Sequence, residues 1–194
     1  MKIAILGAGA MGSALTVPIS ERGHEIRLWF TKYDMPIYNE VSRGKPHPRI
    51  KVMLPDTVKL YKPDELKDVL SDADVIIVAV SSQGVLPISK LVRETVGVPD
   101  SPILIVSKGI EVVNGRTMTM SEIVLKYTGS DKVIYVGGPS LAAELANKRP
   151  TYVVYASGYP DIALEIARAF ETEYYRIDVT SDVTGVELLS LIHI

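Results

Sequence analysis

The feature that most constrains the fold of this chain is a glycine-rich turn directly after a short apolar run near the amino terminus. Residues 3–6 are all apolar, and Gly7-Ala8-Gly9-Ala10-Met11-Gly12 follows without a break. An uninterrupted apolar run predicts a strand covered on both faces, and a helical pattern begins inside the motif. In a dinucleotide-binding unit Gly7 allows the tight turn, Gly9 lets a pyrophosphate approach the backbone, and Gly12 lets the helix pack on the strand. The alternative is a turn that only joins a strand to a helix.

The rest of the chain alternates between short apolar runs and longer helical patterns, which indicates repeated strand–helix–strand units. Strands are expected at residues 25–30, 58–60, 74–80, 103–106, 133–136, 151–156 and 174–177. Helices are expected at residues 10–22, 35–42, 63–70, 83–95, 117–127, 139–147 and 160–170, and a loop at residues 43–56. Thr184 and Glu187 have the spacing of a capping box, which predicts one more helix. We therefore expect an α/β fold of the Rossmann type, a doubly wound and mostly parallel sheet.

Composition excludes several classes of function. The 194 residues carry 21 basic and 23 acidic side chains, a net charge of −2, so neither a nucleic acid nor an anionic membrane is expected as partner. The chain has no cysteine, which excludes disulfides and thiolate chemistry, and its three histidines lie too far apart for a metal site. No apolar run approaches the roughly 20 residues of a membrane span. The amino terminus enters a strand at once, so we expect a cytoplasmic protein.

The choice of cofactor depends on the end of the second strand. NAD-binding domains usually place an acid there, where it binds the ribose 2′-hydroxyl. Here the strand runs into Thr31 and Lys32, and Asp34 lies several positions beyond it. Thr31 and Lys32 could receive a 2′-phosphate, which favours NADP over NAD, although Lys32 could equally be an ordinary surface lysine.

Two further segments follow predicted strands, at the edge where open α/β sheets bind ligands. Lys108 comes directly after the strand at 103–106, where its ammonium group could orient an oxygen of a ligand and stabilise developing charge. The alternative is a lysine in a solvated loop. Gly138 and Ser140 follow the strand at 133–136, and backbone N–H groups with the Ser140 hydroxyl could bind an anion. The alternative is that Ser140 is only a helix N-cap.

These segments together resemble one family. The strings GAGAMGSAL, LW, SKGIE, GGPSLAAELANKRPT and DVTGVEL, in that order from Met1 to about Leu188, are similar to the NAD(P)-dependent glycerol-3-phosphate dehydrogenases. The resemblance implies reversible reduction of dihydroxyacetone phosphate to sn-glycerol 3-phosphate, in a homodimeric parent enzyme. It implies cofactor contacts at Ala10, Met11, Thr31, Lys108 and Ala142, and contacts to the phosphorylated substrate at Lys108, Gly138 and Ser140. Lys108 is the catalytic candidate.

The chain departs from the family pattern at its end. In the family, the last helix continues through a Lys-Asn pair whose lysine moves the proton, and His193 stands at that position here. We expect a dinucleotide-binding domain at 1–180, the start of a truncated helical substrate domain at 181–194, and a non-native tail at 189–194. A fragment of this kind is expected to be inactive. The alternatives are another two-domain dehydrogenase, such as a ketopantoate reductase, and a nucleotide-sensing module without catalysis.

Overall fold

The computed structural model describes residues 1–193, of which His193 is described by its backbone alone. The strands are β1 (Lys2–Leu6), β2 (Glu25–Trp29), β3 (Val58–Tyr61), β4 (Val75–Val78), β5 (Ile103–Ile105), β6 (Ile110–Val113), β7 (Arg116–Thr119), β8 (Val133–Gly137), β9 (Thr151–Ser157) and β10 (Tyr175–Thr180). The α-helices are α1 (Ala10–Glu21), α2 (Met35–Val41), α3 (Leu66–Leu70), α4 (Ser82–Val96), α5 (Met120–Thr128), α6 (Ala142–Ala146), α7 (Pro160–Phe170) and α8 (Val183–Ser190). Short 3₁₀ turns lie at Lys32–Asp34, Pro63–Glu65 and Leu191–His193.

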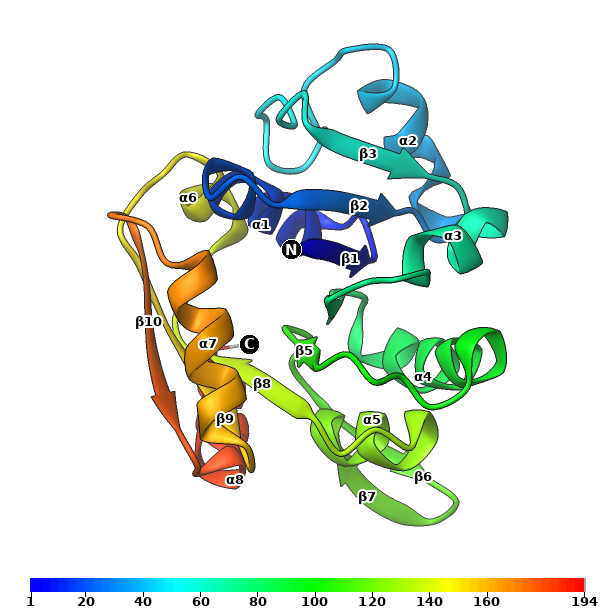
Figure 1. Cartoon of the computed structure of the whole chain (residues 1–194), viewed down its shortest axis with the longest axis vertical. Helices are drawn as coiled ribbons and strands as arrows, with labels where there is room; N and C mark the ends of the chain where they lie inside the picture. Colours follow the sequence, from blue (N-terminus) through cyan, green and yellow to red (C-terminus); the bar gives the residue numbers. More distant parts are fainter. Residues whose placement is uncertain (194) are drawn as a thin grey trace.

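Eight strands form one sheet in the order β10-β9-β8-β5-β4-β1-β2-β3. All neighbours are parallel except β8 and β9, so the expected doubly wound, mostly parallel sheet is confirmed. The sheet is strongly twisted: β3 lies nearly horizontal in Figure 1, whereas β10 at the other edge runs nearly vertical. The strand order reverses beside β1, because β2 lies on one side of it and β4 on the other. Ligands bind at such switch points, outside the carboxyl ends of the strands.

The alternation of side chains along each strand divides the core between the two faces of the sheet. Ile3 and Ile5 of β1 belong to a cluster with apolar residues of α1, α2, α6 and α7. Ala4 and Leu6 point the other way, into a cluster with residues of α3, α4 and α5. Helices α1 and α6 lie side by side, which Figure 1 also shows. Because both faces are covered, β1 has to be apolar at every one of these positions.

One part of the predicted element order is wrong. The helix expected at 117–127 begins only at Met120, and the residues before it form an antiparallel hairpin of β6 and β7. Asn114 and Gly115 join the two strands, with φ angles of 52° and 77°. Asn-Gly is a strong signal for a two-residue hairpin turn, since both residues tolerate positive φ. This signal was present in the sequence, and the helical pattern downstream obscured it.

The predicted capping box at the last helix is also wrong. The N-cap of α8 is Asp182, whose carboxylate accepts a hydrogen bond from the Gly185 N–H at 2.8 Å. Glu187 points away from the helix start and into the core, where its carboxylate accepts bonds from the backbone N–H (3.0 Å) and hydroxyl of Ser121. Glu187 is only 1% exposed. Tertiary burial of this carboxylate therefore replaced the local cap that its spacing predicted.

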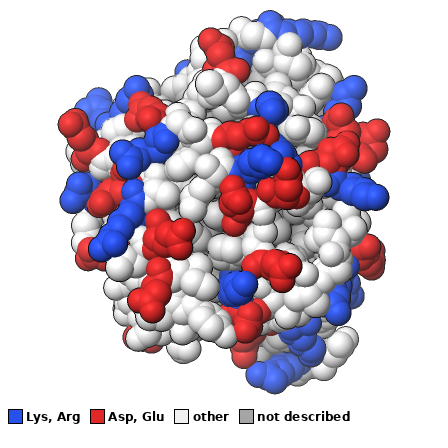
Figure 2. All heavy atoms as spheres, viewed as in Figure 1, with Lys and Arg blue, Asp and Glu red and all other residues white. Residues whose placement is uncertain are grey.

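The surface carries charges of both signs. On the face shown in Figure 2, lysine and arginine side chains are interspersed with aspartate and glutamate, and no large area has a single sign. Over residues 1–193, no helix is both long and apolar enough to cross a bilayer.

Candidate functional site

The three glycines of the glycine-rich turn differ in what a side chain at each position would meet. Gly7 has a φ of +110°, and a Cβ there would lie 2.8 Å from the carbonyl oxygen of Ala79. A Cβ on Gly12 would lie 2.0 Å from the carbonyl oxygen of Gly7, so only glycine lets α1 approach the turn. A Cβ on Gly9 would meet nothing closer than the Arg49 guanidinium at 3.8 Å. Gly9 therefore faces open space, as a backbone that receives a phosphate must.

The amino end of α1 gives the glycine-rich turn a positive electrostatic potential. Gly9 is the N-cap, and none of the described side chains caps the helix. Its first N–H groups thus stay available to an anion, next to the positive end of the helix dipole. Ala10 and Met11 lie half-buried in this first turn, where the resemblance places cofactor contacts.

A cleft of about 720 Å³, which we call the glycine-turn cleft, opens beside this turn. Its walls come from the carboxyl ends of β1, β2 and β4 and from the start of α4, and include Gly9, Trp29, Thr31, Lys32, Arg49 and Gln83. The chain's one tryptophan, Trp29, therefore lines the cleft, and its indole N–H donates to the Pro63 carbonyl at 3.3 Å. The apolar lining and the anion-binding turn together fit an adenosine diphosphate group.

The acid near the end of β2 is already occupied. The Asp34 carboxylate accepts bonds from the Thr31 hydroxyl (2.7 Å) and the Thr31 N–H (3.1 Å), and Asp34 is only 8% exposed. It is thus engaged in a local cap and does not project toward a ribose as the acid of NAD-binding domains does. The Thr31 hydroxyl donates its hydrogen bond to Asp34. Of the predicted pair Thr31 and Lys32, Lys32 is therefore the side chain that can still donate to a phosphate.

Sequence reasoning missed Arg49, which lines this cleft, and His47, which bonds the glycine-rich turn. Both lie in the 43–56 loop, which was predicted only as a connection and does lack regular secondary structure apart from turns. Arg49 lines the glycine-turn cleft, and its guanidinium lies above Gly9. His47 is fully buried beneath the loop and bonds the Ala8 carbonyl. In the sequence these residues form a His-Pro-Arg run, which gives no indication that the loop folds back onto the glycine-rich turn.

The structure brings Lys108 and Gly138 together. Lys108 follows β5, and its ammonium donates to the Gly138 carbonyl at 2.8 Å. Burial lowers the pKa of the Lys108 ammonium from its usual value. Gly138 has a φ of +121°, and a Cβ there would lie 2.9 Å from the Tyr152 carbonyl oxygen, so this turn also requires glycine. Lys108 is thus a half-buried cation held at the carboxyl edge of the sheet, not a lysine in a solvated loop.

Ser140 does not cap a helix. The N-cap of α6 is Leu141, and the Ser140 N–H donates to the Gly138 carbonyl at 3.0 Å. The alternative that Ser140 is only a helix N-cap is therefore wrong, and the Ser140 backbone N–H is not aimed at an anion. Ala142, the first residue of α6, is half-buried on the same core cluster as Ala10 and Met11.

The predicted residues thus form two groups along one edge of the sheet. Gly7, Gly9, Thr31 and Lys32 line the glycine-turn cleft, whereas Lys108 and Gly138 meet beyond it, after β5 and β8. Since β1, β4, β5 and β8 are parallel neighbours, their carboxyl ends lie at the same edge. An extended ligand with a diphosphate at Gly9 could reach Lys108 along this edge. Across residues 1–193, no three His, Asp or Glu side chains gather into a group able to hold a metal ion.

Comparison with known proteins gives a consistent result for the sequence. Residues 2–163 match the family described as the NAD-dependent glycerol-3-phosphate dehydrogenase N-terminus. The chain is 38% identical over 192 residues to the NADP(+)-dependent glycerol-3-phosphate dehydrogenase of Archaeoglobus fulgidus, covering 98% of this chain and 56% of that relative. The chain therefore spans about half the length of the curated relatives it matches.

Solved structures agree on the architecture. The glycerol-3-phosphate dehydrogenase of Coxiella burnetii superposes with a TM-score of 0.83 at 27% identity, over 97% of this chain and 56% of that one. A protein assigned as the 2-dehydropantoate 2-reductase of Enterococcus faecalis gives a TM-score of 0.65 at 18% identity, over 96% and 59%. The second likeness concerns the fold alone and carries no argument for the ketopantoate reductase alternative.

Proposed function

Since this chain belongs to the NAD-dependent glycerol-3-phosphate dehydrogenase family through that family's N-terminal domain, we propose that it binds the cofactor and part of the substrate of such an enzyme. The reaction is hydride transfer between a nicotinamide and dihydroxyacetone phosphate, giving sn-glycerol 3-phosphate. The observation that carries this proposal is the Lys108 ammonium at the Gly138 carbonyl, on the same sheet edge as the glycine-rich turn. A half-buried cation at that place can bind a negatively charged substrate beside the cofactor.

The cofactor we propose is NADPH in preference to NADH. Lys32 and Arg49 are two cations on the wall of the glycine-turn cleft, and Asp34 is engaged by Thr31. A 2′-phosphate would gain ion pairs with these cations, whereas a ribose 2′-hydroxyl would find no free acid. The Archaeoglobus relative is named as NADP(+)-dependent, which agrees with this preference.

Affinity for the two cofactors tests the preference. We expect Lys32→Ala to weaken NADPH binding by roughly tenfold and NADH binding far less, because it removes a charge-assisted contact to the 2′-phosphate. Arg49→Ala should also weaken NADPH binding by roughly tenfold, with a smaller loss for NADH, because the Arg49 guanidinium lies over Gly9 as well. Lys45→Ala is the matched control, since Lys45 lies in the same region of the chain but pairs with Glu40 on the surface. Equal losses for NADPH and NADH, or no loss, would contradict the assignment of the 2′-phosphate to these side chains.

The substrate half of the site would use Lys108 directly. The nicotinamide, when bound, supplies the hydride. The Lys108 ammonium can transfer its hydrogen bond from the Gly138 carbonyl to the substrate carbonyl or phosphate oxygen, and there it stabilises negative charge as the alkoxide forms. The lowered pKa of Lys108 means that burial already disfavours its charge, so a negative partner is bound more strongly. We propose Gly138 and the hydroxyl of Ser140 as further substrate contacts, and Ala10, Met11 and Ala142 as cofactor contacts.

Substrate binding distinguishes this function from a nucleotide sensor. We expect sn-glycerol 3-phosphate to bind to the complex of this chain with NADP, and Lys108→Ala to abolish that binding. Lys90→Ala is the control, because the Lys90 ammonium stacks over the Tyr127 ring, away from both groups of site residues. A sensor would bind the dinucleotide and ignore both glycerol 3-phosphate and the Lys108 substitution.

We propose a homodimeric parent enzyme in the cytoplasm, with a domain boundary near residue 180 and a foreign origin for residues 189–194. The His193 side chain and Ile194 lie outside the described residues, and we give His193 no part in proton transfer. We also expect no turnover of dihydroxyacetone phosphate by the 194-residue chain, which an NADPH-oxidation assay checks. Sequencing the source DNA through codon 188 and beyond tests the boundary and the tail.

A further inference from the structure

The 43–56 loop has a buried anchor. The loop folds back on itself at His47, whose backbone N–H donates to the Val52 carbonyl and whose carbonyl accepts from the Lys51 N–H, both at 2.8 Å. Lys51 takes a φ of +60° to make this turn. The His47 side chain is fully buried, although the loop around it is mostly exposed. Because the His47 ring has no access to water at the centre of this surface loop, both of its nitrogens need hydrogen-bond partners within the protein.

The neighbours of the ring fix its protonation state. Nδ1 faces two backbone N–H groups, those of Arg49 (3.2 Å) and Ile50 (3.4 Å), so it has to be the acceptor. Nε2 faces the Ala8 carbonyl oxygen at 3.1 Å, so it has to carry the hydrogen. The ring is therefore neutral, with the proton on Nε2, and both nitrogens are used.

The two nitrogens of the His47 ring join two parts of the proposed phosphate site, the glycine-rich turn and the 43–56 loop. Ala8 lies between Gly7 and Gly9 in the glycine-rich turn, and the Arg49 guanidinium lies over Gly9. One imidazole thus ties the backbone that would cradle the diphosphate to the backbone that carries the cleft's arginine. The Ser13 hydroxyl also reaches the Ala8 carbonyl, at 3.3 Å, but it lies on α1 and makes no link to the loop.

We propose that His47 is a positioning residue for the cofactor, which holds Arg49 over the glycine-rich turn only while its imidazole is neutral. This inference rests on the proposed cofactor function. A second proton on Nδ1 would face the N–H groups of Arg49 and Ile50, donor against donor, and the loop would have to leave the turn. The His47 ring makes no contact with the cofactor itself and acts through Arg49.

The charges around the ring set the direction of the pH dependence. Burial has the largest effect on the pKa of His47 and lowers it; the bond to the Ala8 carbonyl raises it, the Arg49 guanidinium lowers it, the Asp34 carboxylate raises it, and the net pKa is lowered. The closed loop therefore binds a proton less readily than the released loop does. As pH falls below the ordinary histidine value of about 6.5, the released loop becomes protonated first, so the closed loop and its affinity for NADPH are lost. Above that pH, His47 is neutral in both forms of the loop, so protonation no longer disfavours the closed loop.

The test is the pH dependence of NADPH affinity in the 194-residue chain, followed by quenching of Trp29 fluorescence, for wild type, His47→Asn and His47→Leu. Asparagine keeps a side-chain oxygen as acceptor for the Arg49 and Ile50 N–H groups and does not titrate, but it loses the bond to Ala8, whereas leucine loses both contacts. At about pH 8 we expect His47→Leu to weaken binding by roughly tenfold and His47→Asn to weaken it less, because asparagine still supports the Arg49 backbone. From about pH 8 to pH 5.5, wild type should lose several-fold more affinity than His47→Asn.

The controls separate this role from a general loss of stability. The 2′-phosphate of NADPH titrates in the same range, but it is common to all the variants and cancels in their ratio. His24→Asn is the matched histidine, since its ring also bonds a backbone carbonyl, that of Ala169, far from the cleft. If His47 acts through Arg49, Arg49→Ala should cost much less in the His47→Leu background than in wild type.

The outcomes are distinct. Additive losses for His47→Leu and Arg49→Ala, or a wild-type pH profile in His47→Asn, would overturn the positioning role while leaving the cofactor proposal in place. Should His47→Leu fail to fold, the comparison of His47→Asn with wild type still decides the matter. If wild type binds no NADPH at any pH, the proposed function itself is wrong and this inference is wrong with it.

Discussion

At the scale of single residues, the turn separates glycines needed for folding from a glycine needed for binding. A Cβ on Gly12 would collide with the Gly7 carbonyl, whereas a Cβ on Gly9 would face the open cleft. Gly9 has a φ of −69° and a ψ of −169°, which alanine adopts readily. The two glycines look alike in the sequence, and the structure assigns them different jobs.

The matched pair Gly9→Ala and Gly12→Ala tests this division. We expect Gly9→Ala to keep or slightly raise the free energy of unfolding and to weaken NADPH binding by roughly tenfold or more, since the methyl group would occupy the place of the diphosphate. Gly12→Ala should lower the free energy of unfolding by about 2–3 kcal/mol, because the backbone has to move apart. Urea unfolding and a cofactor titration measure the two effects. A Gly9→Ala protein that binds NADPH as wild type does would contradict the phosphate assignment.

Sequence reasoning placed at the carboxyl edge of the sheet those candidate site residues that carry a local pattern. The glycines, Lys108, Gly138 and Lys32 each follow a strand that can be read from its apolar run, so the edge of the sheet was predictable. His47 and Arg49 were not, because a loop of irregular backbone gives no indication of where it folds back. The role of Asp34 was also hidden, since its distance from the strand did not reveal that Thr31 would engage it.

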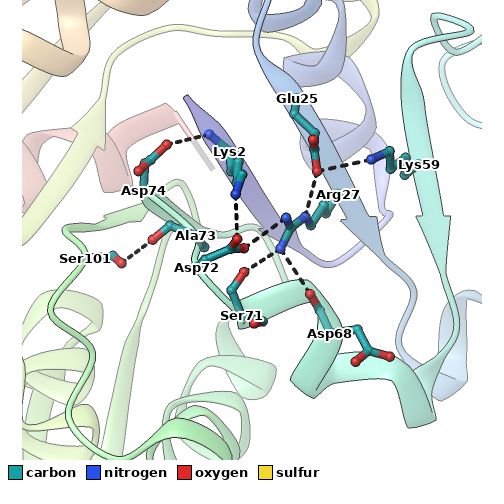
Figure 3. Close-up of polar contacts among 10 residues, drawn as sticks. All are labelled: Lys2, Glu25, Arg27, Lys59, Asp68, Ser71, Asp72, Ala73, Asp74 and Ser101. Carbon is teal, nitrogen blue, oxygen red and sulfur yellow. Dashed lines mark hydrogen bonds and ion pairs between the residues drawn. The ribbon is translucent and has the colours of Figure 1, made fainter.

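At the scale of elements, an ion-pair network holds the amino ends of the strands opposite the site (Figure 3). Arg27 of β2 lies at its centre and bonds the carboxylates of Glu25 and Asp72, each at 3.0 Å. Its guanidinium also donates to the carbonyls of Asp68 and Ser71, which close the turn between α3 and β4. Lys2 on β1 and Lys59 on β3 pair with the same two carboxylates. One arginine thus links three strands to a helix end.

Arg27→Met should lower the free energy of unfolding by about 2 kcal/mol, since two carbonyls and two carboxylates lose a nearly buried donor. Lys45→Met, which breaks the exposed pair with Glu40, should stay within about 0.5 kcal/mol of wild type. Urea unfolding at neutral pH measures both free energies. Equal and small effects would show that the network adds no more than an ordinary surface pair.

The same network predicts an acid dependence of stability. The pKa of Asp72 is lowered by its bond to Lys2 and then by Arg27, and that of Glu25 by Arg27 and Lys59. Carboxyl groups with a lowered pKa stabilise the fold at neutral pH, and this stabilisation is lost as pH falls below about 4. The difference in unfolding free energy between wild type and Arg27→Met should therefore shrink between about pH 7 and pH 3. A difference that is constant over this range would contradict the electrostatic explanation.

Helices and strands were predictable where their apolar residues follow one clear pattern, either a continuous buried run or one face of a helix. The mostly apolar β1, the fully apolar β4 and the strongly amphipathic α7 were placed within two residues of their observed bounds. The hairpin of β6 and β7 was missed because the helical pattern that follows it obscured its Asn-Gly turn, although β6 is rich in β-branched residues. The start of α8 was misplaced because the carboxylate of Glu187 is bound by Ser121, a contact 66 positions away in the chain.

At the scale of the whole molecule, the fold makes one edge of the sheet chemically distinct. The parallel strands β2, β1, β4, β5 and β8 end there, and their loops bring the glycine-rich turn, Lys32 and Lys108 to one side. The adenosine half of a dinucleotide has a cleft of its own, whereas Lys108 and Gly138 lie outside that cleft. We therefore expect cofactor binding to be largely complete in this chain and catalysis to need further structure over Lys108, because hydride transfer requires close and exact placement of both reactants.

The most direct test of the central claim is a titration of the 194-residue chain with NADPH, followed by the fluorescence of Trp29 in the wall of the glycine-turn cleft. We predict saturable binding of one NADPH per chain, tighter than NADH, and strongly weakened by Gly9→Ala in a protein that remains folded. Absence of saturable binding, or binding that Gly9→Ala leaves unchanged, would contradict the assignment of this edge of the sheet as the cofactor site.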